Sequence, residues 1–379
     1  MASRLFGFSA LVIIAVMVTT AIFFYAKGYR INFNQKTISG TGIIQISSLP
    51  KGAAVYIDEA STPKDATDVS LTNLAPGKYK LRLSKNGFID WTKEVEVRAG
   101  LVTQVEALLF PSAPNLRAVT FSGVTKATVS PNSELLVYSV NQKDKEGLWV
   151  LDLSDRPLFF SKEPKQIARD SSGYSFSTSS FEWSPESKSI LVRVKAAGGE
   201  VSFLLDASSL NEQFTDVSGQ VADLKSQWTK DAQVKAADRI NALGNDIKTL
   251  ITGAKKVLFS PEEERVLVVQ ADGKAVVYDS KSYLSFEKTA ATFNVPTADN
   301  YLWYPESAQS DHDSRHLILI RKDSISIVEA DGSNEMTIYT GSFDPSAVFA
   351  WPNGSKLLIS TSLNSSASKQ PNLYSIDLR

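Results

Sequence analysis

The chain has no cysteine among its 379 residues. Disulfide bonds, thiolate metal sites and cysteine nucleophiles are therefore excluded. The absence does not fix the cellular compartment, because many extracytoplasmic bacterial proteins fold without disulfides.

The chain also lacks an excess of either charge. It carries 40 basic and 41 acidic side chains, so it produces no long-range field that would attract nucleic acid or an anionic membrane surface. We expect no nucleic-acid partner.

Histidine is scarce, and both copies, His312 and His316, lie in the segment SDHDSRH. On a helix this spacing would place two imidazoles on one face for a metal. The surrounding sequence YPESAQSDHDSRHLILI instead predicts a turn that enters a strand, and the glutamate of a His-Glu-x-x-His motif is missing. We expect a solvated loop without a metal.

Common catalytic signatures are missing as well. The sequence has no Gly-x-Ser-x-Gly elbow, no phosphate-binding glycine loop and no EF-hand loop. We assign no catalytic, cofactor-binding or metal-binding residue, expect no cofactor, and predict that the chain is not an enzyme.

Near its N-terminus the chain has an uncharged, largely apolar segment, residues 5–26, with the sequence LFGFSALVIIAVMVTTAIFFYA. A bilayer core about 30 Å thick needs roughly 20 helical residues, so this segment is long enough to span it. A cleaved signal peptide would have a shorter apolar region ending in small residues, whereas this one ends in bulky side chains. The sequence favours a retained anchor in the lipid bilayer.

The orientation of this anchor is not settled by its flanking charges. Arg4 precedes the segment, and Lys27, Arg30 and Lys36 come after it, so these charges alone lean slightly against an exported body. The part of the chain that comes after the segment must decide the orientation.

The first folded unit, within residues 31–110, alternates apolar and polar residues with period two from Gly42 onward. Tight-turn residues separate the expected strands, among them Pro76-Gly77 and Asn86-Gly87. The pattern predicts a small antiparallel β-sandwich.

These residues resemble the PEGA domain over about 42–109. The motif residues are Gly42, Ser48, Pro50, Gly52, Ala53, Val55, Tyr56, Ile57 and Asp58, then Leu74, Pro76, Gly77, Tyr79, Gly87, Phe88 and Trp91. The family has Gly after the Asp, and here Glu59 takes that place, so we expect a longer and looser first hairpin loop. The resemblance implies an extracytoplasmic module behind an anchor, and therefore a cytoplasmic N-terminus and an extracytoplasmic body. We give it more weight than the flanking charges.

The second unit, residues 111–379, contains a repeat. An apolar or aromatic residue, then Ser or Tyr, then Pro precedes a polar turn and an apolar strand, and a second strand ends near an acid. The repeats begin VSP at 129–131, WSP with Trp183 and Pro185, FSP with Pro261, WYP with Trp303 and Pro305, and a shortened WP at Trp351.

This repeat predicts four-stranded blades of about 40–50 residues in a β-propeller. Five blades are recognisable and a sixth is possible, and the motifs resemble TolB-type and WD-like repeats. The last blade lacks a strand, which residues 115–122 could supply by closing the ring. The repeated aromatic residues are expected in the core, and the Asp at each strand end is expected to shape a turn.

An insertion at about 208–256 separates the second and third repeats. Ile240, Leu243, Ile247 and Leu250 recur at helical spacing, and an earlier group contains Leu224 and Trp228. One or two amphipathic helices packed on the propeller are expected, with a partner-binding helix or a degenerate sixth blade as alternatives.

The sequence thus predicts an all-β protein with a cytoplasmic tip and a transmembrane helix within residues 1–30, followed by a sandwich and a propeller. We expect a membrane-anchored binding or scaffold protein of the cell envelope, with a protein or glycan ligand. Two alternatives remain: a propeller-based hydrolase or lyase, and a sensor or assembly component that docks a membrane partner through the inserted helices.

Overall fold

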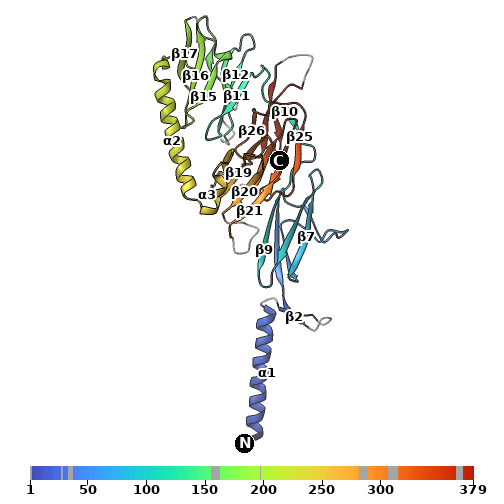
Figure 1. The fold of residues 1–379 in the computed structure, drawn as a ribbon. Helices are drawn as coiled ribbons and strands as arrows, with labels where there is room; N and C mark the ends of the chain where they lie inside the picture. The colour runs from blue at the N-terminus through green and yellow to red at the C-terminus, as the bar shows by residue number, and fades with distance from the viewer. Residues whose placement is uncertain are drawn as a thin grey trace. The chain divides into compact units, whose positions relative to one another are not determined.

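A computed structural model describes residues 2–26, 29–32, 37–154, 163–196, 198–280, 289–305, 315–363 and 370–379. The chain divides into two compact units, Met1–Ser112 and Ala113–Arg379 (Figure 1). Each unit has its own hydrophobic core.

The first unit begins with helix α1 (Ala2–Ala26) and a two-stranded hairpin, β1 (Tyr29–Asn32) and β2 (Thr37–Gly40). None of the helices in the described part of the chain combines the length and the apolar character needed to cross a membrane. The anchor predicted for residues 5–26 is therefore not shown by the structure.

The rest of the first unit is a two-sheet sandwich. One sheet has the order β6-β3-β9 and the other β5-β4-β7-β8. The strands are β3 (Gly42–Leu49), β4 (Ala54–Ile57), β5 (Asp65–Ala66), β6 (Val69–Leu74), β7 (Gly77–Ser84), β8 (Trp91–Val97) and β9 (Val102–Leu108). The predicted sandwich forms, but it is not wholly antiparallel, because β9 returns beside the first strand of the sandwich and pairs with it in parallel.

The core of the sandwich comes from the inward side of the alternating pattern. Ile44, Ile46, Leu81 and Leu83 are fully buried, and Trp91 closes the core from β8. These are the positions at which period two places apolar residues on one face.

The turn after β4 differs from the expectation of a loose loop. Asp58 and Glu59 both have positive φ, 50° and 63°, and Ala60 N donates to Ile57 O at 3.1 Å, which makes a tight turn. The loop to β5 is long, as expected, but Asp58 also fixes its start by accepting from Lys80 N at 2.9 Å. Glu59 therefore adopts the left-handed conformation for which Gly is better suited.

The second unit contains five sheets among the described residues, which we number as blades 1 to 5. Blade 1 is β11 (Lys126–Val129), β12 (Leu135–Val140), β13 (Gly147–Asp152) and β14 (Lys165–Arg169); blade 2 is β15 (Ser180–Trp183), β16 (Ser189–Ala196) and β17 (Gly199–Asp206); blade 3 is β18 (Lys256–Phe259), β19 (Arg265–Val269), β20 (Ala275–Asp279) and β21 (Ala291–Val295); blade 4 is β22 (Asn300–Trp303), β23 (His316–Ile320), β24 (Ser324–Glu329) and β25 (Met336–Thr340); blade 5 is β26 (Val348–Ala350), β27 (Lys356–Thr361), β28 (Asn372–Asp377) and β10 (Leu116–Ala118).

Blade 5 is completed by the start of the unit. Strand β10 pairs antiparallel with β28, with Leu116 opposite Ile376. The predicted use of the segment before the first repeat as the missing strand is confirmed, and it ties the two ends of the second unit together.

The Ser-Pro element of the repeat has a local role. The hydroxyls of Ser130, Ser184 and Ser260 accept from the backbone N–H five residues later at 3.0–3.2 Å, across the turn between the first two strands. Ser and Pro thus define this turn in blades 1 to 3.

The Trp before this element joins neighbouring blades. Trp183 Nε1 donates to Thr128 O at 3.1 Å, and Trp303 Nε1 donates to Leu258 O at 3.1 Å. Each bond links the first strand of one blade to the first strand of the blade before it. Trp351 instead occupies the position that Ser has in blades 1 to 3. Its backbone N–H donates to Lys356 O across the turn, as the backbone N–H of Ser130 does to Leu135 O.

The ring is interrupted between blades 2 and 3. Strands β19 and β23 are buried at every residue, whereas Arg193 and Lys195 on β16 are exposed. The face of blade 3 opposite blade 4 packs Val266 and Val268 against α3 (Asn245–Ile251), where Ile247 is fully buried. Helices, and not a sixth sheet, therefore occupy this position.

Helix α2 (Val221–Asn241) connects the two sides of the interruption, running from blade 2 toward α3 (Figure 1). Lys225 Nζ lies 2.5 Å from Glu182 on blade 2, and Arg239 Nε lies 2.7 Å from Glu263 on blade 3. None of its described side chains is buried. The expected packed stripe is confirmed for α3 but not for α2.

Candidate functional site

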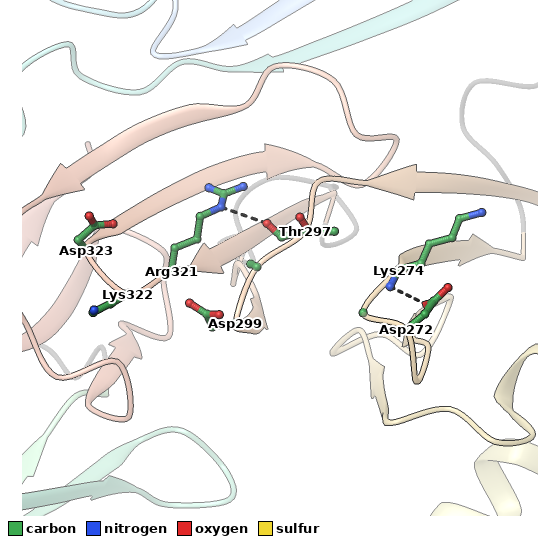
Figure 2. Close-up of a pocket in the computed structure, with 9 residues that line it drawn as sticks. Asp272, Lys274, Thr297, Asp299, Arg321, Lys322 and Asp323 are labelled. Atoms are coloured by element: carbon green, nitrogen blue, oxygen red, sulfur yellow. Dashed lines mark hydrogen bonds between the residues drawn. The ribbon is translucent and has the colours of Figure 1, made fainter.

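A cavity of about 720 Å³ opens on blades 3 and 4 and is lined by three loops. Its lining residues are Asp272, Gly273 and Lys274 from the β19–β20 turn, Thr297, Ala298 and Asp299 from the β21–β22 connection, and Arg321, Lys322 and Asp323 from the β23–β24 turn (Figure 2). In an antiparallel blade, the turn after the second strand and the connection after the fourth lie at the same end. The topology therefore brings these loops together.

Hydrogen bonds fix the shape of the first loop. The carboxylate of Asp272 accepts from Lys274 N at 2.9 Å, and Gly273 between them has a φ of 88°. Asp-Gly is a favoured pair for a tight hairpin because both residues tolerate left-handed backbone. The turn holds Asp272 and Lys274 on the rim of the cavity (Figure 2).

Arg321 joins the other two loops. Its Nε donates to Thr297 O at 3.1 Å, and its Nη1 donates to Glu335 at 2.7 Å and to Ser326 at 3.2 Å. The guanidinium is thus committed to protein acceptors. Arg321 therefore positions the loops. The lining cations that face solvent are instead Lys274 and Lys322, which are exposed.

Tyr301 holds the β21–β22 connection through hydrogen bonds of its hydroxyl. Its hydroxyl accepts from Ala298 N at 2.7 Å and donates to Pro296 O at 3.1 Å. The side chain is 1% exposed, and burial raises the pKa of the phenol. A neutral tyrosine therefore holds Ala298 and its neighbours in place.

The cavity is polar and carries both charges. Asp272, Asp299 and Asp323 supply carboxylates, Lys274 and Lys322 supply ammonium groups, and no aromatic ring is among the lining residues. Such a surface can form charge-assisted hydrogen bonds with a ligand that carries groups of both signs. It offers no stacking platform for a sugar ring.

The histidine segment does not contribute to this cavity. His316 is the first residue of β23 and is buried, opposite Glu329, so the solvated loop expected for it is wrong. Arg321 follows the other end of β23, which places His316 and the cavity at opposite ends of that strand. His312 lies outside the described residues, within which no group of three or more potential ligands is placed to hold a metal.

The acids at the strand ends have two different roles. The carboxylates of Asp152 and Asp206 accept from the backbone N–H two residues later, at 2.8 and 2.7 Å, as the turn hypothesis expects. Asp279 instead pairs with Arg265 at 3.1 Å, and Asp377 pairs with Arg117 at 3.0 Å. A turn role therefore accounts for only part of the set.

The motif residues singled out in the sequence lie elsewhere, and none lines the cavity. Gly42, Pro50, Gly52, Ala53, Asp58, Pro76, Gly77 and Gly87 lie in the sandwich, and Trp183, Pro185, Pro261, Trp303, Pro305 and Trp351 lie at the ends of first strands or in the turns that come after them. Gly42 has a packing reason, since a Cβ there would lie 2.5 Å from Arg98 O. The only sequence signal for the cavity is the Asp-Gly turn, which is common in hairpins.

One known family matches part of the first unit, and several solved structures are similar to the chain. Residues 41–112 match the family model of the PEGA domain. Similar solved structures include TolB from Acinetobacter baumannii, at 11% identity and a TM-score of 0.24, with 79% of this chain and 59% of that chain covered.

Two further structures are similar to the chain. An auxiliary nutrient binding protein from Bacteroides thetaiotaomicron has 9% identity and a TM-score of 0.30, covering 85% of this chain and 90% of that one. A putative TolB from Agrobacterium tumefaciens has 12% identity and a TM-score of 0.21, covering 67% and 73%. These likenesses say nothing of ligand or activity, and no curated protein matches the chain.

Proposed function

We propose that the chain is a membrane-anchored, extracytoplasmic binding or scaffold protein of the cell envelope. The observation that carries the binding role is the mixed-charge cavity held by three loops of blades 3 and 4. The PEGA match over residues 41–112 supports the extracytoplasmic placement.

The anchor is part of the same proposal and rests on α1. Large apolar side chains from Phe8 to Phe24 are 44–71% exposed on this helix. Apolar surface of this extent is costly in water and favourable in a lipid bilayer, and the segment 5–26 contains no charge.

We favour a polypeptide ligand over a glycan. The cavity offers the carboxylates of Asp299 and Asp323 as acceptors and the ammonium group of Lys322 as a donor. These groups complement a polypeptide segment that carries both basic and acidic side chains. A glycan would more often meet an aromatic ring, and none lines this cavity. A non-enzymatic role agrees with the separation of His316 from the cavity.

A site-specific photocrosslinker at Lys322 tests this function in cells that produce the full chain. Lys188 is the matched control, because it is also an exposed lysine in a turn, but between the first two strands of blade 2, outside the cavity. We expect a polypeptide adduct at position 322 that disappears in an Asp299→Lys variant. Equal adducts at both positions, or adducts insensitive to this variant, would refute the assignment, and a glycan adduct would refute the preferred ligand.

A further inference from the structure

Strand β9 is an edge strand of the sandwich. It pairs in parallel with β3, and no other described strand lies beside it. Ile43 N donates to Leu101 O at 3.0 Å, and Leu109 N donates to Leu49 O at 2.9 Å, one bond at each end of the pairing. The N–H and C=O groups of successive residues point in alternate directions, so those of the odd-numbered residues of β9 point toward β3.

The even-numbered residues of β9 therefore direct their N–H and C=O groups away from the sheet. Val102, Gln104 and Leu108 are among them. An edge of this kind is a template for a further strand, because its donors and acceptors recur at two-residue intervals.

Strand β8, an edge of the other sheet, is protected against such pairing. Strand β8 carries Lys93, Glu94 and Glu96 within seven residues, and Glu94 forms an ion pair with Lys78 at 2.7 Å. Charged side chains of this kind discourage strand addition. Strand β9 has a single charged side chain, Glu106, no proline, and an unbroken register along β3.

Exposed apolar side chains lie at the start of the same edge. Among the described residues of the sandwich, the most exposed large apolar side chains are Val102 at 50%, Leu101 at 43% and Leu49 at 38%. Leu101 directly precedes β9 and Val102 is its first residue, whereas Leu49 lies on the central strand β3. A strand laid along β9 would lie beside Leu101 and Val102 while it paired with the backbone.

We propose that the β9 edge of the PEGA-like sandwich is a docking site for an extended strand of a partner protein. The backbone pattern selects an extended polypeptide, because only that geometry meets donors and acceptors at this spacing. Val102 to Leu108 spans about 20 Å at about 3.3 Å per residue, which fits a partner segment of roughly seven residues. The segment carries an apolar side chain at the end beside Val102 and an uncharged centre, opposite Gln104. This site is on the other unit from the cavity and does not depend on the function proposed for it.

Two variants at one position separate backbone pairing from side-chain contact. Gln104→Pro removes an outward N–H and places the proline ring at the edge, and it leaves the ladder with β3 intact because that N–H is not part of it. Gln104→Ala keeps the N–H and is the matched control. A fluorescent seven-residue peptide of alternating leucine and threonine, with blocked ends, serves as the probe for the full chain in detergent micelles.

We expect the probe to bind the wild type and Gln104→Ala alike, to slow exchange of the Val102 and Gln104 amides of the wild type, and to bind Gln104→Pro at least tenfold more weakly. Equal binding to both variants, or protection on β8 in place of β9, would overturn the proposal. Self-association of the chain that protects the same amides would also overturn it, because the occupant would then be a second copy. Val102→Lys, which adds an edge charge without proline, is expected to weaken binding too, and shows whether a failed Gln104→Pro variant reflects misfolding.

Discussion

The buried ion pair of blade 3 allows a sharp test of how this propeller is stabilised. Arg265 begins β19 and Asp279 ends β20, directly opposite it, with Nε 3.1 Å from Oδ2. Their side chains are 0% and 2% exposed. Glu262 lies 3.4 Å from Nη1 of the same guanidinium. Loss of either member of the pair leaves a charge in a site from which water is excluded.

We predict that Arg265→Met and Asp279→Asn each lower the free energy of unfolding of the second unit by about 3–5 kcal/mol. A double variant, Arg265→Met with Asp279→Leu, replaces both charges by apolar groups and is expected to cost about 0–2 kcal/mol, so the two effects are far from additive. Glu263→Gln is the control in the same blade. Its ion pair with Arg239 is 46% exposed on both sides, and we expect a loss below about 1 kcal/mol.

Denaturant unfolding of the full chain, followed by tryptophan fluorescence, measures these differences. Five of the six tryptophans lie in the second unit, so the signal reports mainly on the propeller. Hydrogen exchange of β19 and β20 amides then shows whether the loss begins in blade 3. Single variants that cost no more than Glu263→Gln, or a double variant that costs the sum of the singles, would refute the reasoning.

Three further results are expected. Hydrogen bonds from Ser208, first from its hydroxyl and then from its backbone N–H, lower the pKa of Asp206. Ser208→Ala should therefore raise that pKa toward 3.8 in a carboxyl NMR titration, and an unchanged pKa would argue against this contact. The stability that the contact provides is complete above the ordinary pKa and is lost as pH falls through the lowered one. Trp303→Phe removes the indole donor to the Leu258 carbonyl and should cost about 1–3 kcal/mol, with faster amide exchange in β18 and β22; unchanged exchange would show that the bond does not link the blades. Glu59→Gly removes the strain of a non-Gly residue in the left-handed conformation, so it should raise the midpoint of thermal unfolding of the sandwich by the equivalent of about 1 kcal/mol. A lower midpoint would mean that the contact of Glu59 with Lys80 contributes more than this strain costs.

Local pattern was sufficient for the sandwich and for the blades. Period-two alternation predicted strands whose inward residues, such as Ile44 and Leu81, are buried. The repeat likewise predicted that residues before the first blade would complete the last one, and β10 does so. In the first case neighbouring residues along the chain carry the information. In the second the repeat carries it, because it shows that the last blade lacks a strand.

The parts that escaped prediction depend on contacts between distant segments. The parallel pairing of β9 with β3 follows from how the two sheets close, which no strand encodes by itself. The burial of His316 follows from its place at the start of β23, whereas the pattern of a turn entering a strand had suggested a solvated loop. The cavity needs three loops that the ring brings together, so its residues carry no joint sequence signal.

The interruption of the ring was predictable from the sequence only in part. The helical spacing of Ile247 and Leu250 predicted a helix packed on the propeller, and α3 is that helix. The exposure of Arg193 and Lys195 on β16 is visible in the sequence as charged residues within an apolar strand. Such a strand has one face in water, which is the property of a terminal blade and not of one enclosed in a ring.

The placement of the chain across a membrane is tested most directly by thiol labelling, which the absence of cysteine makes clean. Full-length variants with one cysteine each, at Ala2, at the exposed Lys64 of the sandwich or at the exposed Lys188 of the propeller, are treated with a membrane-impermeant maleimide on intact cells. We predict that the cysteines at positions 64 and 188 are labelled on intact cells and that the one at position 2 is labelled only after permeabilisation. Labelling at position 2 alone, or at none of the three before permeabilisation, would contradict an extracytoplasmic binding protein held by its N-terminal helix.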